Sequence, residues 1–276
     1  MSFNPFTDDP KVDLEYPPDQ QMLVIESGGY LINGLIEIAQ GQGPHPTILL
    51  LHGFPGVEKN TDLAHVFRRA GFNVVIFSYR GSWGSKGSYS FKHCAEDCVN
   101  VVKFLQNNCD TYRIKKDDII IIGTSFGGFL ALYSAFKLPS IHRASSVSGF
   151  HLDIVKNVFQ NENDRKNQTI IKELFIESMN PLMDTSPDKL IQEILHIDSW
   201  DFTNYHEILS TKDLCLISAL KDEIVPPELY HFPLIKKIEE YKPKQLFHTT
   251  FYDAQHSYSD HRIRLTQTLL DWLRQN

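Results

Sequence analysis

The sequence has little of what several protein classes require. Four cysteines among 276 residues are too few for a disulfide scaffold. No stretch approaches the roughly 18 consecutive apolar residues of a membrane span. Basic residues are the minority, with 27 Lys and Arg against 34 Asp and Glu and a net charge of −7, and they form no basic stripe, which disfavours nucleic-acid binding. Residues 1–18 lack the basic and apolar regions of a secretory signal. We therefore expect a reduced, soluble, cytoplasmic protein that binds neither nucleic acid nor membrane; its oligomeric state stays open.

The order of periodic segments predicts an α/β fold. Short Val- and Ile-rich runs are typical of strands buried on both faces, and they alternate with stretches of helical periodicity. Such alternation indicates right-handed crossovers and a mostly parallel sheet. The expected strands are residues 21–26, 30–39, 47–51, 73–79, 118–122, 213–220 and 244–252.

The helices are expected between these runs. Leu63, Val66, Phe67 and Ala70 share one helical face, and Gly71 follows as a C-terminal cap. A longer helix carries Cys94 and Cys98 on its apolar stripe, so core packing is the better interpretation of these thiols than metal binding. Further helices are expected after Ser125, over 227–241, and at the end of the chain to Leu273.

Residues 150–210 show three helical stripes and no strand-like run between them. We interpret this stretch as a helical insertion, at about 150–212, within a single domain that spans 1–276.

The clearest chemical signal is Gly123-Thr124-Ser125-Phe126-Gly127. It follows an Ile-rich strand and opens a helix, which is the context of a G-x-S-x-G nucleophile elbow. A tight strand-to-helix turn projects the serine hydroxyl, and the glycines remove β-carbons that would collide there. Ser125 is the candidate nucleophile.

A serine hydroxyl becomes a good nucleophile only when a base takes its proton, and a carboxylate is needed to orient a histidine base. His256 follows the last expected strand, whereas its competitors His248 and His261 fall inside a strand and a helix. Asp222 follows the preceding strand, and we prefer it to its neighbour Glu223 because it comes directly after the apolar run. The elbow order of nucleophile, acid and histidine is thus satisfied.

The oxyanion donors are expected in His52-Gly53-Phe54-Pro55-Gly56, which follows the strand at 47–51. The backbone amides of Phe54 and Phe126 are the candidate donors. We assign His52 a packing role beneath the loop. Trp83, Phe54 and Phe150 are candidate pocket residues.

In these pieces the sequence resembles the α/β-hydrolase superfamily. The matching segments are HGFPG, GTSFGG, the Asp222 loop and His256, in the family's order, and residues 79–87 resemble a segment of its esterase and prolyl-oligopeptidase-like branches. The resemblance implies an eight-stranded sheet with an antiparallel second strand, helices on both faces, and a small helical cap after the sixth strand.

These features predict a cofactor-independent serine hydrolase, carboxylesterase-like, that takes small acyl substrates. Aminopeptidase or acyl-aminoacyl peptidase, thioesterase and carbon–carbon bond hydrolase activities would use the same triad. A catalytically dead binding protein on this fold is the alternative outside enzymes.

Overall fold

The computed structural model describes residues 4–8, 11–243 and 245–275. Within them the chain forms one eight-stranded sheet in the order β1-β2-β4-β3-β5-β6-β7-β8. The strands are β1 Asp19–Ser27, β2 Tyr30–Ile38, β3 His45–Leu51, β4 Asn73–Phe77, β5 Ile114–Thr124, β6 Arg143–Val147, β7 Asp213–Ala219 and β8 Phe247–Tyr252. The first position expected for the last strand, residue 244, lies outside the described residues.

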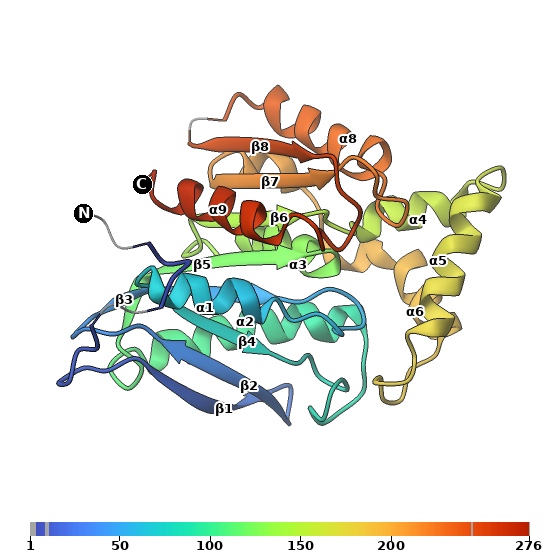
Figure 1. Ribbon diagram of the computed structural model, residues 1–276. Helices are drawn as coiled ribbons and strands as arrows, with labels where there is room; N and C mark the ends of the chain where they lie inside the picture. The colour runs from blue at the N-terminus through green and yellow to red at the C-terminus, as the bar shows by residue number, and fades with distance from the viewer. Residues whose placement is uncertain (1–3, 9–10, 244, 276) are drawn as a thin grey trace.

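The pairing confirms the expected topology. Strand β2 runs antiparallel to both β1 and β4, and every later pairing is parallel. The carboxyl ends of β3, β5, β7 and β8 therefore reach the same edge of the sheet (Figure 1). Sequence reasoning from the residues found no strand at β6, although the family resemblance implied an eighth strand.

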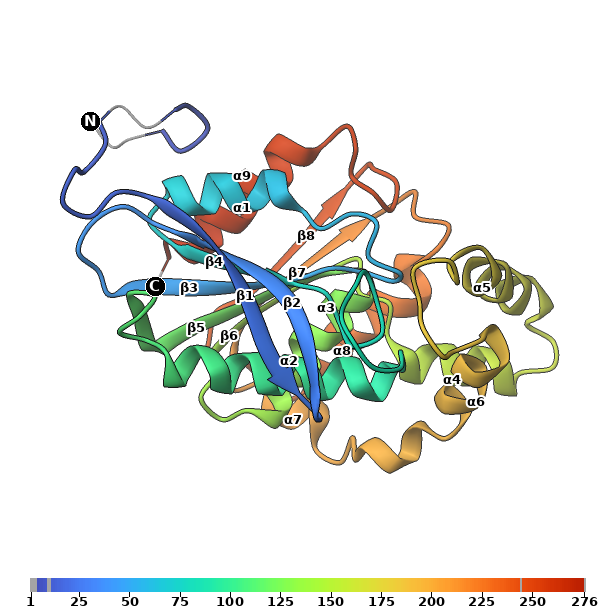
Figure 2. The same ribbon diagram turned by 90° about the horizontal axis from the view of Figure 1, so that it is seen from below.

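Helices cover both faces of the sheet. Helices α1 and α9 pack on one face, and α2, α3 and α8 on the other (Figure 2). The helices between strands are α1 Thr61–Arg69, α2 Phe91–Asn107, α3 Phe126–Lys137, α8 Pro227–Glu240 and α9 Arg262–Leu273. The buried residues of α1 and α2 are those on the helical stripes of the sequence, whereas α3 is buried on all sides from Phe126 to Phe136.

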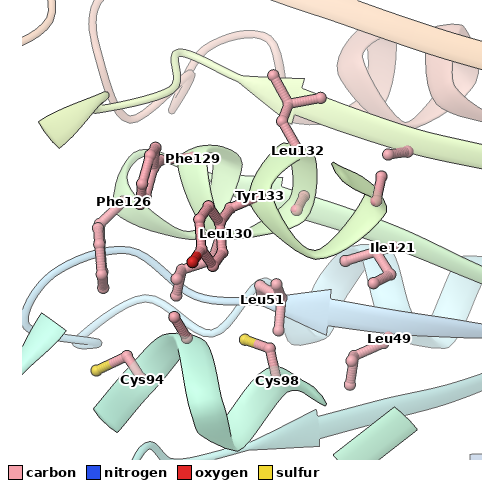
Figure 3. Close-up of a cluster of buried hydrophobic side chains, with 14 of the residues drawn as sticks. Leu49, Leu51, Cys94, Cys98, Ile121, Phe126, Phe129, Leu130, Leu132 and Tyr133 are labelled. Atoms are coloured by element: carbon pink, nitrogen blue, oxygen red, sulfur yellow. The ribbon is translucent and has the colours of Figure 1, made fainter. Parts of the chain in front are cut away.

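The larger core lies between the sheet and helices α2 and α3. Cys94 and Cys98 of α2 both belong to it, and Cys98 lies beside Leu51 of β3 (Figure 3). Both thiols are fully buried, and burial raises their pKa well above the ordinary value. They serve as small apolar side chains of the core, as the stripe predicted.

The segment between β6 and β7 is helical. Its elements are α4 Leu152–Gln160, α5 Arg165–Glu177, α6 Pro187–Leu195, the 3₁₀ helix η1 Ile197–Trp200, and α7 Tyr205–Leu209. Helices α4, α5 and α6 project beyond the carboxyl edge of the sheet (Figure 1). Phe175 of α5 touches Phe54, with ring centroids 5.3 Å apart, so this segment reaches the loop after β3.

Candidate active site

Ser125 occupies a strained turn between β5 and α3. Its backbone has φ 54° and ψ −125°, a conformation that a non-glycine residue adopts only when its surroundings enforce it. The surroundings are backbone hydrogen bonds: the Ser125 amide donates to Val147 at 2.9 Å, and its carbonyl accepts from Phe150 at 2.9 Å. The turn thus has the strained strand-to-helix geometry that the sequence pattern predicts for a nucleophile elbow.

The glycines around Ser125 allow close backbone approach. A β-carbon on Gly123 would collide with the Gly127 carbonyl, and one on Gly127 would collide with the Leu51 carbonyl. A β-carbon on Gly53 would lie 2.9 Å from the Ser125 β-carbon. Side chains at these positions would push the elbow and the loop after β3 apart.

His256 and Asp222 meet across the ends of β7 and β8. The pairing of the two strands continues into their loops, because the Lys221 amide donates to the Ala254 carbonyl at 2.9 Å. The His256 Nδ1 atom lies 2.6 Å from Asp222 Oδ2. Nδ1 is thereby committed to the carboxylate, and Nε2 is the ring nitrogen left to exchange a proton.

Asp222 is 4% exposed, and its other oxygen is also occupied. Oδ1 accepts from the amides of Ile224 and Val225 at 3.0 and 2.7 Å. Three donors thus fix a buried carboxylate, which is how such a charge is accommodated in a protein interior. Glu223, by contrast, is exposed.

A cavity of about 200 Å³ brings the candidate residues together. Ser125, His256 and Phe54 all line it, and Val57, Glu58 and Arg262 lie on its wall. Neither Trp83 nor Phe150 is among its lining residues. Phe150 is buried, stacked on Tyr230 with ring centroids 5.7 Å apart, and Trp83 lies beside the loop after β3.

The candidate oxyanion donors are the amides of Phe54, which lines this cavity, and of Phe126, which directly follows the lining residue Ser125 in the chain. Phe126 opens helix α3, so its N–H has no partner within the helix. Within the described part of the chain, neither amide donates a hydrogen bond to the protein. Both therefore remain available to an oxygen atom bound near Ser125.

His52 lies under the loop and outside the cavity. It is buried, and burial lowers its pKa to about 3, so the ring is neutral. Its Nδ1 atom donates to the Gly53 carbonyl at 2.7 Å, and the Tyr79 hydroxyl donates to the His52 carbonyl at 2.9 Å. These bonds support a packing role for His52.

A chain of polar contacts, absent from the sequence-based expectations, joins three segments of the site. Arg262 Nη2 donates to Asn60 Oδ1 at 2.9 Å, and Asn60 Nδ2 donates to Thr124 Oγ1 at 3.1 Å. Asp62 holds the Arg262 guanidinium through two further hydrogen bonds. Because Arg262 lies 202 residues from Asn60, no local sequence pattern signals this contact.

The comparisons with known proteins agree with this architecture. The family model described as BD-FAE matches residues 37–181, just over half of the chain. Among curated proteins, an uncharacterized 31.7 kDa protein of Escherichia coli is 35% identical over 99 residues, which cover 33% of this chain and 32% of that protein. An uncharacterized membrane protein of Saccharomyces cerevisiae is 30% identical over 162 residues, which cover 58% of this chain and 48% of that protein. The matches thus cover 32% and 48% of the lengths of these two relatives.

Solved structures share the fold at low sequence identity. An α/β hydrolase of Penicillium has a TM-score of 0.67 at 17% identity, with 94% of this chain and 98% of that one covered. An esterase of Pyrococcus furiosus has a TM-score of 0.64 at 17% identity, with 95% and 93% covered. The acylaminoacyl peptidase of Pyrococcus horikoshii has a TM-score of 0.65 at 14% identity, with 92% and 41% covered. These similarities confirm the α/β-hydrolase fold.

Among the residues described, no helix has both the length and the apolar character needed to cross a membrane.

Proposed function

The chain belongs to the BD-FAE family, and from this premise we propose that it is a serine hydrolase of small carboxylic esters or related acyl compounds. One observation carries the proposal. Ser125, in a strained elbow, shares a cavity with His256, whose Nδ1 atom is held by the buried Asp222 carboxylate. Nucleophilic acyl transfer uses a serine, a histidine and a carboxylate in these roles, and the shared cavity supports assigning them to these three residues.

In the first step the Ser125 Oγ atom attacks the acyl carbon. His256 Nε2 accepts the hydroxyl proton as the new C–O bond forms, and Asp222 stabilises the resulting imidazolium. The carbonyl oxygen becomes an oxyanion, which accepts hydrogen bonds from the amides of Phe54 and Phe126.

The tetrahedral intermediate then collapses to an acyl-enzyme. The bond to the leaving group breaks, and the leaving oxygen takes the proton from His256 Nε2. In the second half, His256 removes a proton from water, the resulting hydroxide attacks the acyl carbon, and the proton returns to Ser125 Oγ as the carboxylic acid departs.

The cavity supports a small acyl group as substrate. A volume of about 200 Å³ lies below the roughly 300–1,000 Å³ of pockets that enclose drug-sized ligands. Phe54 and Val57 supply apolar wall, while Glu58 and Arg262 supply charge.

Two assays test this function: covalent labelling by a fluorophosphonate, and hydrolysis of p-nitrophenyl acetate. We expect the wild-type chain to be labelled at Ser125 and Ser125→Ala to lose both labelling and turnover, by several orders of magnitude in kcat. Ser199→Ala, which removes an exposed hydroxyl far along the chain, serves as the matched control and should behave as wild type. Equal turnover by Ser125→Ala would refute the proposal, and a wild-type chain that is not labelled would favour a binding protein.

A panel of substrates then separates the activities that share this triad. The panel contains acyl esters of rising chain length, an acyl thioester and an aminoacyl amide. The esters vary the acyl chain, whereas the thioester and the amide vary the leaving group. We expect the short esters to give the highest kcat/KM.

A further inference from the structure

Trp83 is an exposed aromatic side chain whose polar atom is nevertheless committed. It lies in the loop after β4, is 42% exposed, and adopts a positive φ of 49°. Its indole Nε1 atom donates to the Pro55 carbonyl at 2.7 Å. The left-handed backbone conformation is unfavourable for a tryptophan, and it persists only where surrounding contacts enforce it. The contacts of the loop therefore hold Trp83 in this conformation.

The acceptor of this bond belongs to the loop that carries the Phe54 amide. Within the described part of the chain, two hydrogen bonds tie positions 54–58 to the rest of the protein: the indole bond to the Pro55 carbonyl, and the bond from the Asn60 amide to Glu58 Oε1 at 2.5 Å. The indole bond is the one that holds a backbone carbonyl of this loop. Outside those positions, the bond from Tyr79 to the His52 carbonyl fixes one end of the loop, and Asn60 fixes the other.

Gly56 lies between Trp83 and His52. It has a φ of 98°, and a β-carbon there would lie 3.0 Å from the Trp83 indole nitrogen and 2.5 Å from His52 Cε1. Both rings therefore border the space that a side chain at Gly56 would occupy. The indole is the more exposed of the two rings, because Trp83 is 42% exposed whereas His52 is buried.

The backbone of the Trp83 loop is joined in turn to the helical segment between β6 and β7. The Trp83 amide donates to the Pro181 carbonyl at 3.3 Å, and an antiparallel bridge pairs Ser82 with Leu182. The Met183 amide donates to the Gly81 carbonyl at 2.8 Å. Trp83 thus connects the residues before α6 with the loop after β3.

We propose that Trp83 is a positioning residue for ester hydrolysis: its indole N–H fixes the Pro55 peptide and thereby holds the Phe54 amide toward the oxyanion. The inference rests on the proposed function. Hydrogen bonds to an oxyanion stabilise the transition state only when the donor is already oriented, so a loop free to rotate lowers kcat rather than substrate binding.

The test compares Trp83→Phe with Trp272→Phe. Trp83→Phe keeps an aromatic ring and deletes the indole donor. Trp272→Phe makes the same chemical change in the core, where the indole nitrogen has no hydrogen-bond partner within the described residues. The measurements are kcat and KM for p-nitrophenyl acetate, the inhibition constant of phenylboronic acid, whose serine adduct presents a tetrahedral oxygen to the oxyanion site, and the thermal unfolding midpoint.

We expect Trp83→Phe to lower kcat about tenfold, the value of one hydrogen bond, and to weaken phenylboronic acid by a similar factor. Its KM should stay within about twofold of wild type. Trp272→Phe should lower the unfolding midpoint and leave kcat and boronate binding unchanged.

Two results would overturn the inference. One is a Trp83→Phe variant with wild-type kcat and boronate affinity. The other is the same set of changes in both variants: a lower kcat, a higher KM and a lower unfolding midpoint in Trp83→Phe and in Trp272→Phe alike. That result would show that both substitutions act through a general loss of stability. Either outcome leaves the proposed function intact so long as wild type is labelled and Ser125→Ala is inactive; failure of the latter two tests removes the function itself.

Discussion

The Asp222 carboxylate, 34 residues before His256, contacts the imidazole through one oxygen and its own loop through the other. The loop bonds hold the side chain in place whether or not the histidine is present. The role of the charge can therefore be separated from the role of the fold.

Asp222→Asn should abolish most activity without unfolding the protein. The amide oxygen can still accept from Ile224 and Val225, but the amide nitrogen would donate to His256 Nδ1 and favour the tautomer with its proton on Nε2. We expect kcat to fall on the order of 10⁴-fold, as in other triads. Steady-state kinetics with p-nitrophenyl acetate and a urea unfolding curve measure the two effects.

Glu223→Gln is the control for that experiment. It changes the neighbouring, exposed carboxylate in the same way. Its kcat should stay within about twofold of wild type. If Glu223→Gln lost as much activity as Asp222→Asn, the acid assigned to His256 would be the wrong one.

Acid should destabilise the fold through buried neutral histidines. His231 accepts from the Gly149 amide at 2.7 Å and contacts Ser218 Oγ at 2.5 Å, and burial lowers its pKa to about 3 from 6.5. Burial likewise lowers the pKa of His52 and His151 to about 3. Between the folded-state pKa of about 3 and the ordinary pKa of 6.5, these histidines bind protons in the unfolded chain but not in the folded one. The free energy of unfolding therefore falls as the pH falls below about 6.5.

The slope of the free energy of unfolding against pH tests whether these histidines are responsible. Each of these histidines should contribute roughly 1 kcal/mol per pH unit between about pH 6 and 4, as measured by urea unfolding at a series of pH values. His231→Asn, which can keep one acceptor and one donor, should reduce the slope by one such increment. His196→Asn changes an exposed histidine and should leave the slope as in wild type. A pH-independent stability over this range contradicts the assignment.

The ion pair between Arg80 and Asp97 should be costly to break from one side. Both side chains are almost fully buried, and Arg80 Nη2 lies 2.8 Å from Asp97 Oδ1. Arg80→Met leaves the carboxylate buried without its counter-charge, and we expect it to lower the free energy of unfolding by about 3–5 kcal/mol in urea unfolding.

Adding Asp97→Asn to Arg80→Met should restore part of that loss. The neutral amide no longer needs a cation. Its oxygen can take the place of the Asp97 oxygen that accepts from the Arg80 backbone amide, and its NH2 group can donate to the Ser27 hydroxyl, which bonds to the other Asp97 oxygen in wild type. If the double variant were less stable than Arg80→Met, the cost would come from lost packing of the arginine stem and not from the uncompensated charge.

The sequence predicted most of the sheet because strands such as β3, β4 and β5 contain short runs rich in Val, Ile and Leu, but it did not reveal β6. That strand reads Arg143-Ala-Ser-Ser-Val and lacks the β-branched run that marks its neighbours. Its serines are small because α3 packs closely there: a β-carbon on Gly128 would lie 2.7 Å from Ser146 Oγ. Close packing of small residues is a tertiary requirement, and no local pattern records it.

The candidate triad was predictable because each member follows a recognisable strand. Ser125, Asp222 and His256 sit just past β5, β7 and β8, and parallel strands bring such positions to one edge. The contacts around them were not predictable. The bonds from Trp83 to Pro55 and from Arg262 to Asn60 join segments 28 and 202 residues apart, and they depend on how loops pack.

Arg262 begins the last helix, and its partner Asn60 immediately precedes the first. The two helices lie together on one face of the sheet (Figure 2). Proteolysis or truncation that removed the C-terminal helix would therefore strip the apolar cover from that face and, in the same cut, free the residue that braces Thr124 beside the nucleophile. Intactness of the carboxyl terminus is in this way a condition for an ordered catalytic edge as well as for a stable domain.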